Sequence, residues 1–146
     1  MDQFTEAYIE AMLWSTSLPP YGECPGCGET RVLDRWRDYG EHVCNDCSDR
    51  EPNYEPAADD NYGVCDISPD LMELILKDCA KFQDENDISE RGESQAGHDF
   101  WLTREGHGCG FWDGDWPITG DILTKASEAY GEMYLYVGDD GKIYGS

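Results

Sequence analysis

Two Cys-x-x-Cys pairs constrain this chain more than any other feature of its sequence. The first pair lies in the segment CPGCG (24–28) and the second in CNDC (44–47). Each pair can form a short turn that points two sulfur atoms at one ion about 2.3 Å away, and two such turns complete a tetrahedron. We therefore expect one zinc ion with four ligands, Cys24, Cys27, Cys44 and Cys47. Because four sulfurs leave no open coordination position, the expected role of the zinc is structural.

Two disulfides in a secreted domain are the alternative interpretation of the same cysteines. The chain opens without a basic leader and apolar run, and it contains no apolar stretch long enough to span a membrane. Its seven cysteines are an odd number, which leaves Cys65, Cys79 and Cys109 as single residues. This pattern favours a reducing cytosol, so we expect a cytoplasmic protein with reduced thiols. The three single cysteines are expected to be small apolar core residues, although the glycine-rich stretch around Cys109 can expose it.

The charge of the chain limits its partners. The 146 residues include 32 acidic and 10 basic ones, which gives a formal net charge of −22. Such an excess repels nucleic acid phosphates and anionic membranes, so a partner is expected to be basic or uncharged. Five Trp, nine Tyr and four Phe distinguish the chain from a disordered acidic tail, because they supply apolar surface for a folded core.

The charge is unevenly distributed, which indicates a separate module. Between Cys24 and Arg50 there are six acidic and four basic residues, whereas the rest of the chain carries −20. This nearly neutral module contains the arginine-rich segment RVLDRWR (31–37), and an acidic, proline-containing linker (51–62) follows it. We expect three parts: residues 1–21 as the N-terminal helix of a body, residues 22–56 as a four-cysteine zinc module, and residues 57–146 as the α+β body.

Three segments have the signals of helices. The first begins near Asp2 or Thr5, either of which can cap it, and the second begins at the strong start signal Ser68-Pro69-Asp70. The third follows Thr119 as its cap and ends at Gly131. The apolar positions of the first two helices are expected in the core: Phe4, Tyr8, Ala11 and Met12, then Leu71, Met72, Ile75, Cys79 and Phe82.

Two further regions are expected to form β-hairpins. Residues 99–104 and 110–112 are aromatic and β-branched runs on either side of EGHG, and residues 133–137 and 142–144 flank the turn GDDG. We expect an α+β fold in which helices cover one antiparallel sheet made from these two hairpins. The first hairpin is expected to have cross-strand pairs among Phe100, Trp101, Phe111 and Trp112. Three of its side chains are expected to be buried under a helix: Phe100, Leu102 and Phe111.

Three segments carry a resemblance to a known family. They are AYIEAMLWS (7–15), GHDFWLTREGHGCGFWD (97–113) and LYVGDDGKIY (135–144), and the similarity covers the opening helix and roughly residues 65–146. In these segments the chain resembles a family of small acidic proteins encoded by tailed bacteriophages. The resemblance implies a phage source and the cytoplasm of a host cell, but it brings no assigned activity. Members usually have a short polar linker where the four-cysteine module stands, which implies an inserted module with its own partner.

Two histidines near Cys109 are the candidate catalytic groups. His98, next to Asp99, and His107 can in principle form a Cys/His nucleophile or a metal pair, because a thiolate needs a nearby imidazole or cation. The large negative charge disfavours a thiolate, and no third orienting group is identifiable. We therefore expect hydrogen-bonding roles for both histidines and no enzymatic activity.

The carboxylates have two interpretations. They form either a solvated surface that keeps the protein in solution or an imitation of DNA presented to a basic groove on a host enzyme. A globule of this length exposes roughly 7,500 Å², or about one net charge per 340 Å², whereas duplex DNA has about one per 110 Å². Mimicry therefore requires the acids to gather on one face. The acids expected to gather are Asp59, Asp60, Asp84, Glu85, Asp87, Glu90, Glu93, Asp113 and Asp115.

These observations predict a phage-encoded, non-enzymatic protein that binds a basic surface on a host nucleic-acid-handling or defence protein and inhibits or redirects it. The cysteine module is expected to add a contact through Arg31, Arg35, Trp36 and Arg37. The alternative is a zinc-ribbon adaptor that touches nucleic acid or the transcription machinery through the same segment, with the acidic body as a solubiliser. Salt-sensitive binding to a basic protein favours the first hypothesis, and retention of DNA or RNA favours the second.

Overall fold

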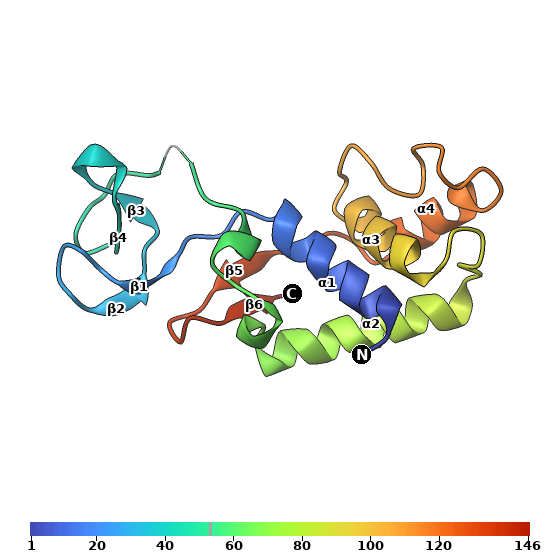
Figure 1. The fold of residues 1–146 in the computed structure, drawn as a ribbon, viewed down its shortest axis with the longest axis horizontal. Helices are drawn as coiled ribbons and strands as arrows, with labels where there is room; N and C mark the ends of the chain where they lie inside the picture. Colours follow the sequence, from blue (N-terminus) through green and yellow to red (C-terminus); the bar gives the residue numbers. More distant parts are fainter. Residues whose placement is uncertain (53) are drawn as a thin grey trace. The chain divides into compact units, whose positions relative to one another are not determined.

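A computed structural model describes residues 1–52 and 54–146, except for the side chain of Tyr39 (Figure 1). The described chain divides into two compact units. The helical unit comprises Met1–Met12, Pro69–Tyr134 and Ser146, and the cysteine unit comprises Leu13–Ser68 and Leu135–Gly145. This division differs from the expected one in three places, because residues 13–21, residues 57–68 and the last hairpin belong to the cysteine unit and not to the body.

The α+β class is confirmed. The helices are α1 (Gln3–Ser15), α2 (Pro69–Glu85), α3 (Glu93–Arg104) and α4 (Gly120–Glu128), with short 3₁₀ helices at Asp38–Gly40, Ala58–Asp60 and Val64–Asp66. The strands are β1 (Tyr21–Glu23), β2 (Thr30–Val32), β3 (Arg35–Trp36), β4 (His42–Val43), β5 (Leu135–Val137) and β6 (Ile143–Gly145). Among the described helices, none is both long and apolar enough to cross a membrane.

The strands of the described residues form three separate antiparallel pairs, β1–β2, β3–β4 and β5–β6. The expected C-terminal hairpin is confirmed, because β5 and β6 pair around a turn in which the Gly138 N–H donates to the Lys142 carbonyl (2.9 Å). The expectation of one sheet made from two hairpins is wrong. Its other half, residues 99–112, contains no strand.

Residues 99–104 lie in α3, and the loop that follows carries residues 110–112. Eight of the twelve residues of α3 are buried. A helix that is buried nearly all round has no amphipathic period, so aromatic and β-branched composition alone gave a false strand signal. Close packing also depends on Gly97, where a Cβ would lie 2.0 Å from the carbonyl oxygen of Phe4 in α1.

The expected burial in this segment is confirmed although its secondary structure is different. Phe100 and Leu102 are 0% exposed and Phe111 is 1% exposed. The expected cross-strand aromatic pairs are wrong, because α3 is a helix and Trp112 is 53% exposed. Burial of these side chains therefore follows from their apolar character, independently of the element that carries them.

Two predicted helix starts are confirmed. The Thr5 N–H donates to Asp2 Oδ1 (2.8 Å), which caps α1. The second helix, α2, begins at Pro69, the favoured position for proline. Its buried side chains are Leu71, Ile75, Cys79 and Phe82, which confirms four of the five predicted core positions, whereas Met72 is only half-buried.

The start of α4 is capped from a distance. Thr119 makes no side-chain cap of its own. The Glu90 carboxylate instead accepts hydrogen bonds from the N–H groups of Ile118 (3.0 Å) and Thr119 (2.9 Å) and from the Thr119 hydroxyl (2.8 Å). A carboxylate at a helix N-terminus also interacts favourably with the helix dipole.

Aromatic rings form the centre of the helical unit. Phe82 of α2 and Phe100 of α3 stack with centroids 4.1 Å apart and 18° between their planes. Phe4 and Tyr8 of α1 pack on Phe100 at 5.9 and 5.4 Å, and Phe111 stacks on Phe82 at 5.9 Å. Three helices and the loop after α3 therefore share one core.

A buried cation lies beside this core. Arg104 is 6% exposed, and its guanidinium pairs with Asp78 of α2 (3.1 Å) and donates to the Tyr8 hydroxyl of α1 (2.9 Å). It also donates to the carbonyls of Gly131 (3.0 Å) and Tyr130 (3.3 Å), which follow α4. Buried charges are tolerated when they are paired and hydrogen-bonded. These contacts satisfy Arg104 and connect α1, α2, α3 and the end of α4.

Replacing Leu102 with alanine should destabilise the helical unit. The side chain is completely buried, so Leu102→Ala should lower the free energy of unfolding by about 2–5 kcal/mol through lost transfer energy and a residual cavity. Leu76→Ala, at a position of α2 that is 44% exposed, is the matched control and should change stability by less than about 0.5 kcal/mol. Chemical denaturation measures both, and equal effects would contradict the core assignment.

Candidate metal centre

Short turns at two places position the four cysteines. The first pair lies in the turn between β1 and β2, where the Cys24 N–H donates to the Glu29 carbonyl (2.8 Å) and the Gly28 N–H to the Cys24 carbonyl (2.7 Å). The second pair follows β4 directly, with the Cys47 N–H donating to the Cys44 carbonyl (3.1 Å). The two turns belong to the separate strand pairs β1–β2 and β3–β4, and the Cys44 N–H donates to Cys24 Sγ (3.4 Å) between them.

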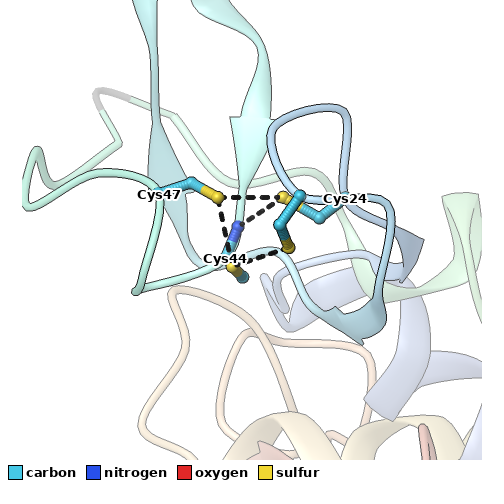
Figure 2. A group of neighbouring side chains, drawn as sticks. Cys24, Cys44 and Cys47 are labelled. Carbon is cyan, nitrogen blue, oxygen red and sulfur yellow. Dashed lines mark hydrogen bonds between the residues drawn. The ribbon is translucent and has the colours of Figure 1, made fainter.

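The sulfur atoms have the geometry of a tetrahedral site. Figure 2 shows the side chains of Cys24, Cys44 and Cys47 pointing toward one another. The Sγ–Sγ distances are 3.7 Å for Cys24–Cys47, 3.7 Å for Cys44–Cys47 and 3.8 Å for Cys27–Cys44, and all four atoms lie within 4.8 Å of one another. A tetrahedron with metal–sulfur bonds of about 2.3 Å has edges of about 3.8 Å. The four predicted ligands are therefore already arranged to hold one metal ion.

Backbone donors surround one of these sulfurs. The N–H groups of Gly26 and Cys44 each lie 3.4 Å from Cys24 Sγ. Burial raises the pKa of Cys24, but backbone donors outweigh burial and lower it to about 6. Gly26 is also required sterically, because a Cβ there would lie 2.7 Å from Cys47 Sγ. The first turn is thus shaped to hold a thiolate.

The module has little apolar core of its own. In the described residues, its buried cluster consists of Cys24, Leu33, Val43 and Cys44, with Cys47 packed against it. Two aliphatic side chains bury far too little surface to order a module of this length. We therefore expect metal–thiolate bonds to supply much of the stability of the module, as in small zinc modules that unfold without metal.

The arginines of the module are paired with carboxylates. Arg31 donates to Asp46 and to Asn45 (3.2 Å), and its Nη1 lies 3.6 Å from Cys44 Sγ. This places a positive charge beside the thiolates, which a four-cysteine metal site with its net negative charge favours. The other ion pairs are Arg35 with Asp34 and Glu51, Arg37 with Glu41, and Arg50 with Asp38.

Trp36, also expected to contact a partner, lies half-buried within the module. Its Nε1–H donates to His42 Nε2 (3.3 Å), and the two rings meet edge to face with centroids 5.8 Å apart. The expected contact segment is therefore largely used in holding the module together. Its role toward a partner stays a prediction.

The acids expected to gather are distributed over both units. Asp59 and Asp60 belong to the cysteine unit, and the other seven belong to the helical unit. Within the helical unit, the bonds from Glu90 to Ile118 and Thr119 bring the segment 84–93 against the loop that carries Asp113 and Asp115. Convergence of all nine acids on one face stays a prediction.

Some of these acids have structural roles that the sequence did not reveal. Asp87 accepts hydrogen bonds from the Ser89 N–H (3.0 Å) and hydroxyl (2.6 Å), which lower its pKa. Asp113 accepts from the Gly110 N–H (3.2 Å). The remaining carboxylates of the set are exposed: Asp59, Asp60, Asp84, Glu85, Glu93 and Asp115.

Asp99 is a buried carboxylate whose oxygens are occupied. The Trp116 Nε1–H (2.7 Å) and the Gln95 amide (3.0 and 3.1 Å) donate to it, and His98 Nδ1 lies 2.9 Å from Oδ1. Neither Gln95 nor Trp116 was identified from sequence, since only the helix and the following loop bring them together. This arrangement agrees with the hydrogen-bonding role expected for His98.

The three single cysteines lie in different environments. Cys79 is buried in the helical core, and burial raises its pKa to about 12. Cys109 is half-buried, and its pKa is also raised by burial and by nearby carboxylates. Cys65 is exposed, so the expectation of a core position is wrong for this residue. It lies in the 3₁₀ helix Val64–Asp66, which presents no buried residue.

Comparison with protein-family models, characterised proteins and solved structures returns no match for this chain.

Removing one sulfur should remove the metal. We expect Cys44→Ser to reduce the metal bound per chain from about one to near zero, because a buried ligand is lost from a site that the module needs for folding. Elemental analysis measures the metal, and amide hydrogen exchange should show loss of protection across residues 21–50 with α2 and α3 unchanged. Cys65→Ser, at an exposed cysteine outside the cluster, is the matched control and should keep its metal. A metal content that Cys44→Ser leaves intact would contradict the assignment.

Acid should release the metal. In the metal-free site the lowered pKa of Cys24 favours a thiolate, whereas the neighbouring Cys44 thiol raises the pKa of Cys47 to about 12. Cys47 therefore keeps its proton at neutral pH until a metal displaces it. Since metal binding releases protons, affinity should rise with pH by about tenfold per pH unit for each proton released. Competition with a chromophoric chelator at several pH values measures this slope, and a flat profile would contradict it.

Proposed function

We propose that this protein is an anionic, non-catalytic binding protein whose surface carboxylates associate with a basic surface on another protein. Both units are strongly negative: the helical unit has 18 acidic and five basic residues, and the cysteine unit has 14 acidic and five basic residues. An anionic surface of this kind attracts a basic partner over a long range and speeds its association.

The observation that carries the proposal is the pairing of cations inside the protein. All four arginines of the segment 31–50 lie within ion-pair distance of carboxylates of the same unit, and Arg104 is buried. These pairs neutralise the only arginine-rich segment, so the charge that the protein presents outward is negative. This weighs against the zinc-ribbon adaptor hypothesis, which needs cations for phosphate contacts.

We propose zinc as the resident ion of the metal centre. A tetrahedral set of four thiolates suits zinc or iron. Zinc gives a closed structural site of this kind and is redox-inactive, which fits a centre that shapes a binding module. In this role Cys24, Cys27, Cys44 and Cys47 hold the ion and take no part in chemistry. Elemental analysis distinguishes the two metals directly.

For a phage protein, the proposed partner is a host nucleic-acid-handling or defence enzyme, because a DNA-binding groove presents the required cations. Binding in that groove would inhibit or redirect the enzyme by imitating DNA. The contact between the segment 84–93 and the loop with Asp113 and Asp115 supports a concentrated acidic region on the helical unit.

Salt and DNA competition test this proposal. A basic protein recovered from host extract on the immobilised, zinc-loaded chain should bind with a dissociation constant that rises steeply with salt, and duplex DNA should compete for it. Neutralising four exposed acids together, Asp84→Asn, Glu85→Gln, Glu93→Gln and Asp115→Asn, should weaken binding at least tenfold at low salt. Glu90 is kept because it caps α4.

The matched control neutralises four acids elsewhere in the same unit, Glu6→Gln, Glu10→Gln, Asp70→Asn and Glu73→Gln, which are also exposed. It changes the net charge equally, so a similar loss would indicate only general attraction. A complex that survives high salt and leaves the partner's DNA binding unchanged would reject mimicry. Retention of DNA or RNA by the chain itself would favour the adaptor hypothesis.

A further inference from the structure

The β5–β6 hairpin, red in Figure 1, carries two tyrosines side by side on neighbouring strands. Tyr136 and Tyr144 are direct cross-strand partners, and their rings stack with centroids 5.7 Å apart and 17° between their planes. Tyr136 is 47% exposed and Tyr144 is half-buried. A cross-strand aromatic pair stabilises a hairpin, and here it also offers a tyrosine ring to solvent.

The turn of the same hairpin adds carboxylates beside the rings. Asp139 and Asp140 lie in the turn and, with the two tyrosines, line a shallow hollow of ≈ 570 Å³. We call this site the tyrosine hollow. Asp140 accepts hydrogen bonds from the Tyr144 hydroxyl (2.7 Å) and from the Lys142 N–H (3.0 Å). These bonds lower the pKa of Asp140, so its carboxylate is charged at neutral pH.

The hairpin turn is anchored on β1. The Tyr21 hydroxyl donates to the Asp139 carbonyl (3.1 Å), and a Cβ at Gly141 would lie 2.6 Å from the Tyr21 ring. Gly141 has a φ of 80°, which favours glycine. At the start of β6, just after the turn, the Ser68 N–H donates to the Ile143 carbonyl (2.9 Å). The turn that carries the carboxylates is therefore held by contacts to Tyr21 and Ser68.

We propose that the tyrosine hollow binds the guanidinium group of an arginine side chain on a basic protein partner. A guanidinium is planar and stacks on tyrosine faces, while carboxylates accept its N–H groups. The proposal rests on the proposed function, because it names the contact by which an anionic protein holds a basic partner.

Charge complementarity selects this occupant. The turn contributes two carboxylates, and the unit as a whole has 14 acidic and five basic residues, so an anionic group would be repelled. A purely apolar group would remove water from the charges of Asp139 and Asp140 without supplying a hydrogen-bond donor or a positive charge, which is costly. An arginine side chain satisfies both demands, because its charge meets the carboxylates and its flat face meets the rings.

Peptide binding to the full-length, zinc-loaded protein tests the hollow. The probe is a hexa-arginine peptide with blocked ends, and its hexa-citrulline counterpart is the neutral control of nearly equal shape. In amide-resolved NMR, hexa-arginine should shift the resonances of residues 136–144, and hexa-citrulline should leave them unchanged. Equal shifts with both peptides, or arginine-induced shifts that avoid the hairpin, would overturn the proposal.

Ring variants separate stacking from general attraction. Tyr136→Leu should raise the dissociation constant for hexa-arginine about two- to fivefold, whereas Tyr136→Phe should keep it within about twofold because the aromatic face remains. Tyr54→Leu, at an exposed tyrosine of the same unit outside the hollow, should have no effect. If Tyr136→Leu has no larger effect than Tyr54→Leu, the rings do not bind the cation.

Single-charge variants complete the test. Asp139→Asn and Asp59→Asn each remove one negative charge from the cysteine unit, so they reduce general attraction equally. Asp139→Asn should weaken peptide binding at least twofold more than Asp59→Asn. Equal effects of the two variants would overturn the proposal that the hollow binds arginine. Salt-sensitive capture of a basic partner would in that case still support the proposed function. Loss of that capture would instead overturn the proposed function itself.

Discussion

The structure of the β1–β4 module centres on four sulfur atoms that lie at the corners of one tetrahedron. Around them the module buries only Leu33 and Val43 as aliphatic core residues among those described, and its strands are two or three residues long. Chain entropy outweighs the burial of so little apolar surface. We therefore expect the order of the β1–β4 module, including the strand on which the C-terminal hairpin is anchored, to depend on metal binding.

The helical unit is stabilised differently, by a buried cation, Arg104. Its acidic surface would favour expansion by self-repulsion, and its aromatic core must hold four helices of ordinary length. Arg104 contributes a charged pair with Asp78 and neutral hydrogen bonds to Tyr8 and to two carbonyls, so every side of the guanidinium meets a partner. A packing that separated Arg104 from these partners would leave a buried charge unpaired, so the network favours this arrangement of the helices.

The carboxylates of this protein serve two purposes, and the structure separates them. Some hold the fold: Glu90 caps α4, Asp87 and Asp113 close loops, and Asp46 and Glu41 pair with arginines of the cysteine unit. Others point to solvent and make up the negative surface on which the proposed binding function depends. The arginines of the cysteine unit are paired with carboxylates of the same unit, so they do not offer free positive charge to a partner. The contacts within the fold are therefore consistent with the proposed function.

Sequence alone determined those features that depend on neighbours in the chain. The cysteine ligands follow from a two-residue spacing, the starts of α1 and α2 from Asp2 and Pro69, and the last hairpin from a GDDG turn. Features that depend on distant residues were decided by tertiary structure. The segment 99–104 lies in a helix that is buried on nearly all sides, and this burial erases the sequence periodicity by which a helix is recognised. The arginine ion pairs, the capping of α4 by Glu90 and the stacking of Tyr136 on Tyr144 were also not predicted from the sequence. Contacts between charged or aromatic side chains do not produce a recognisable residue spacing in a single sequence.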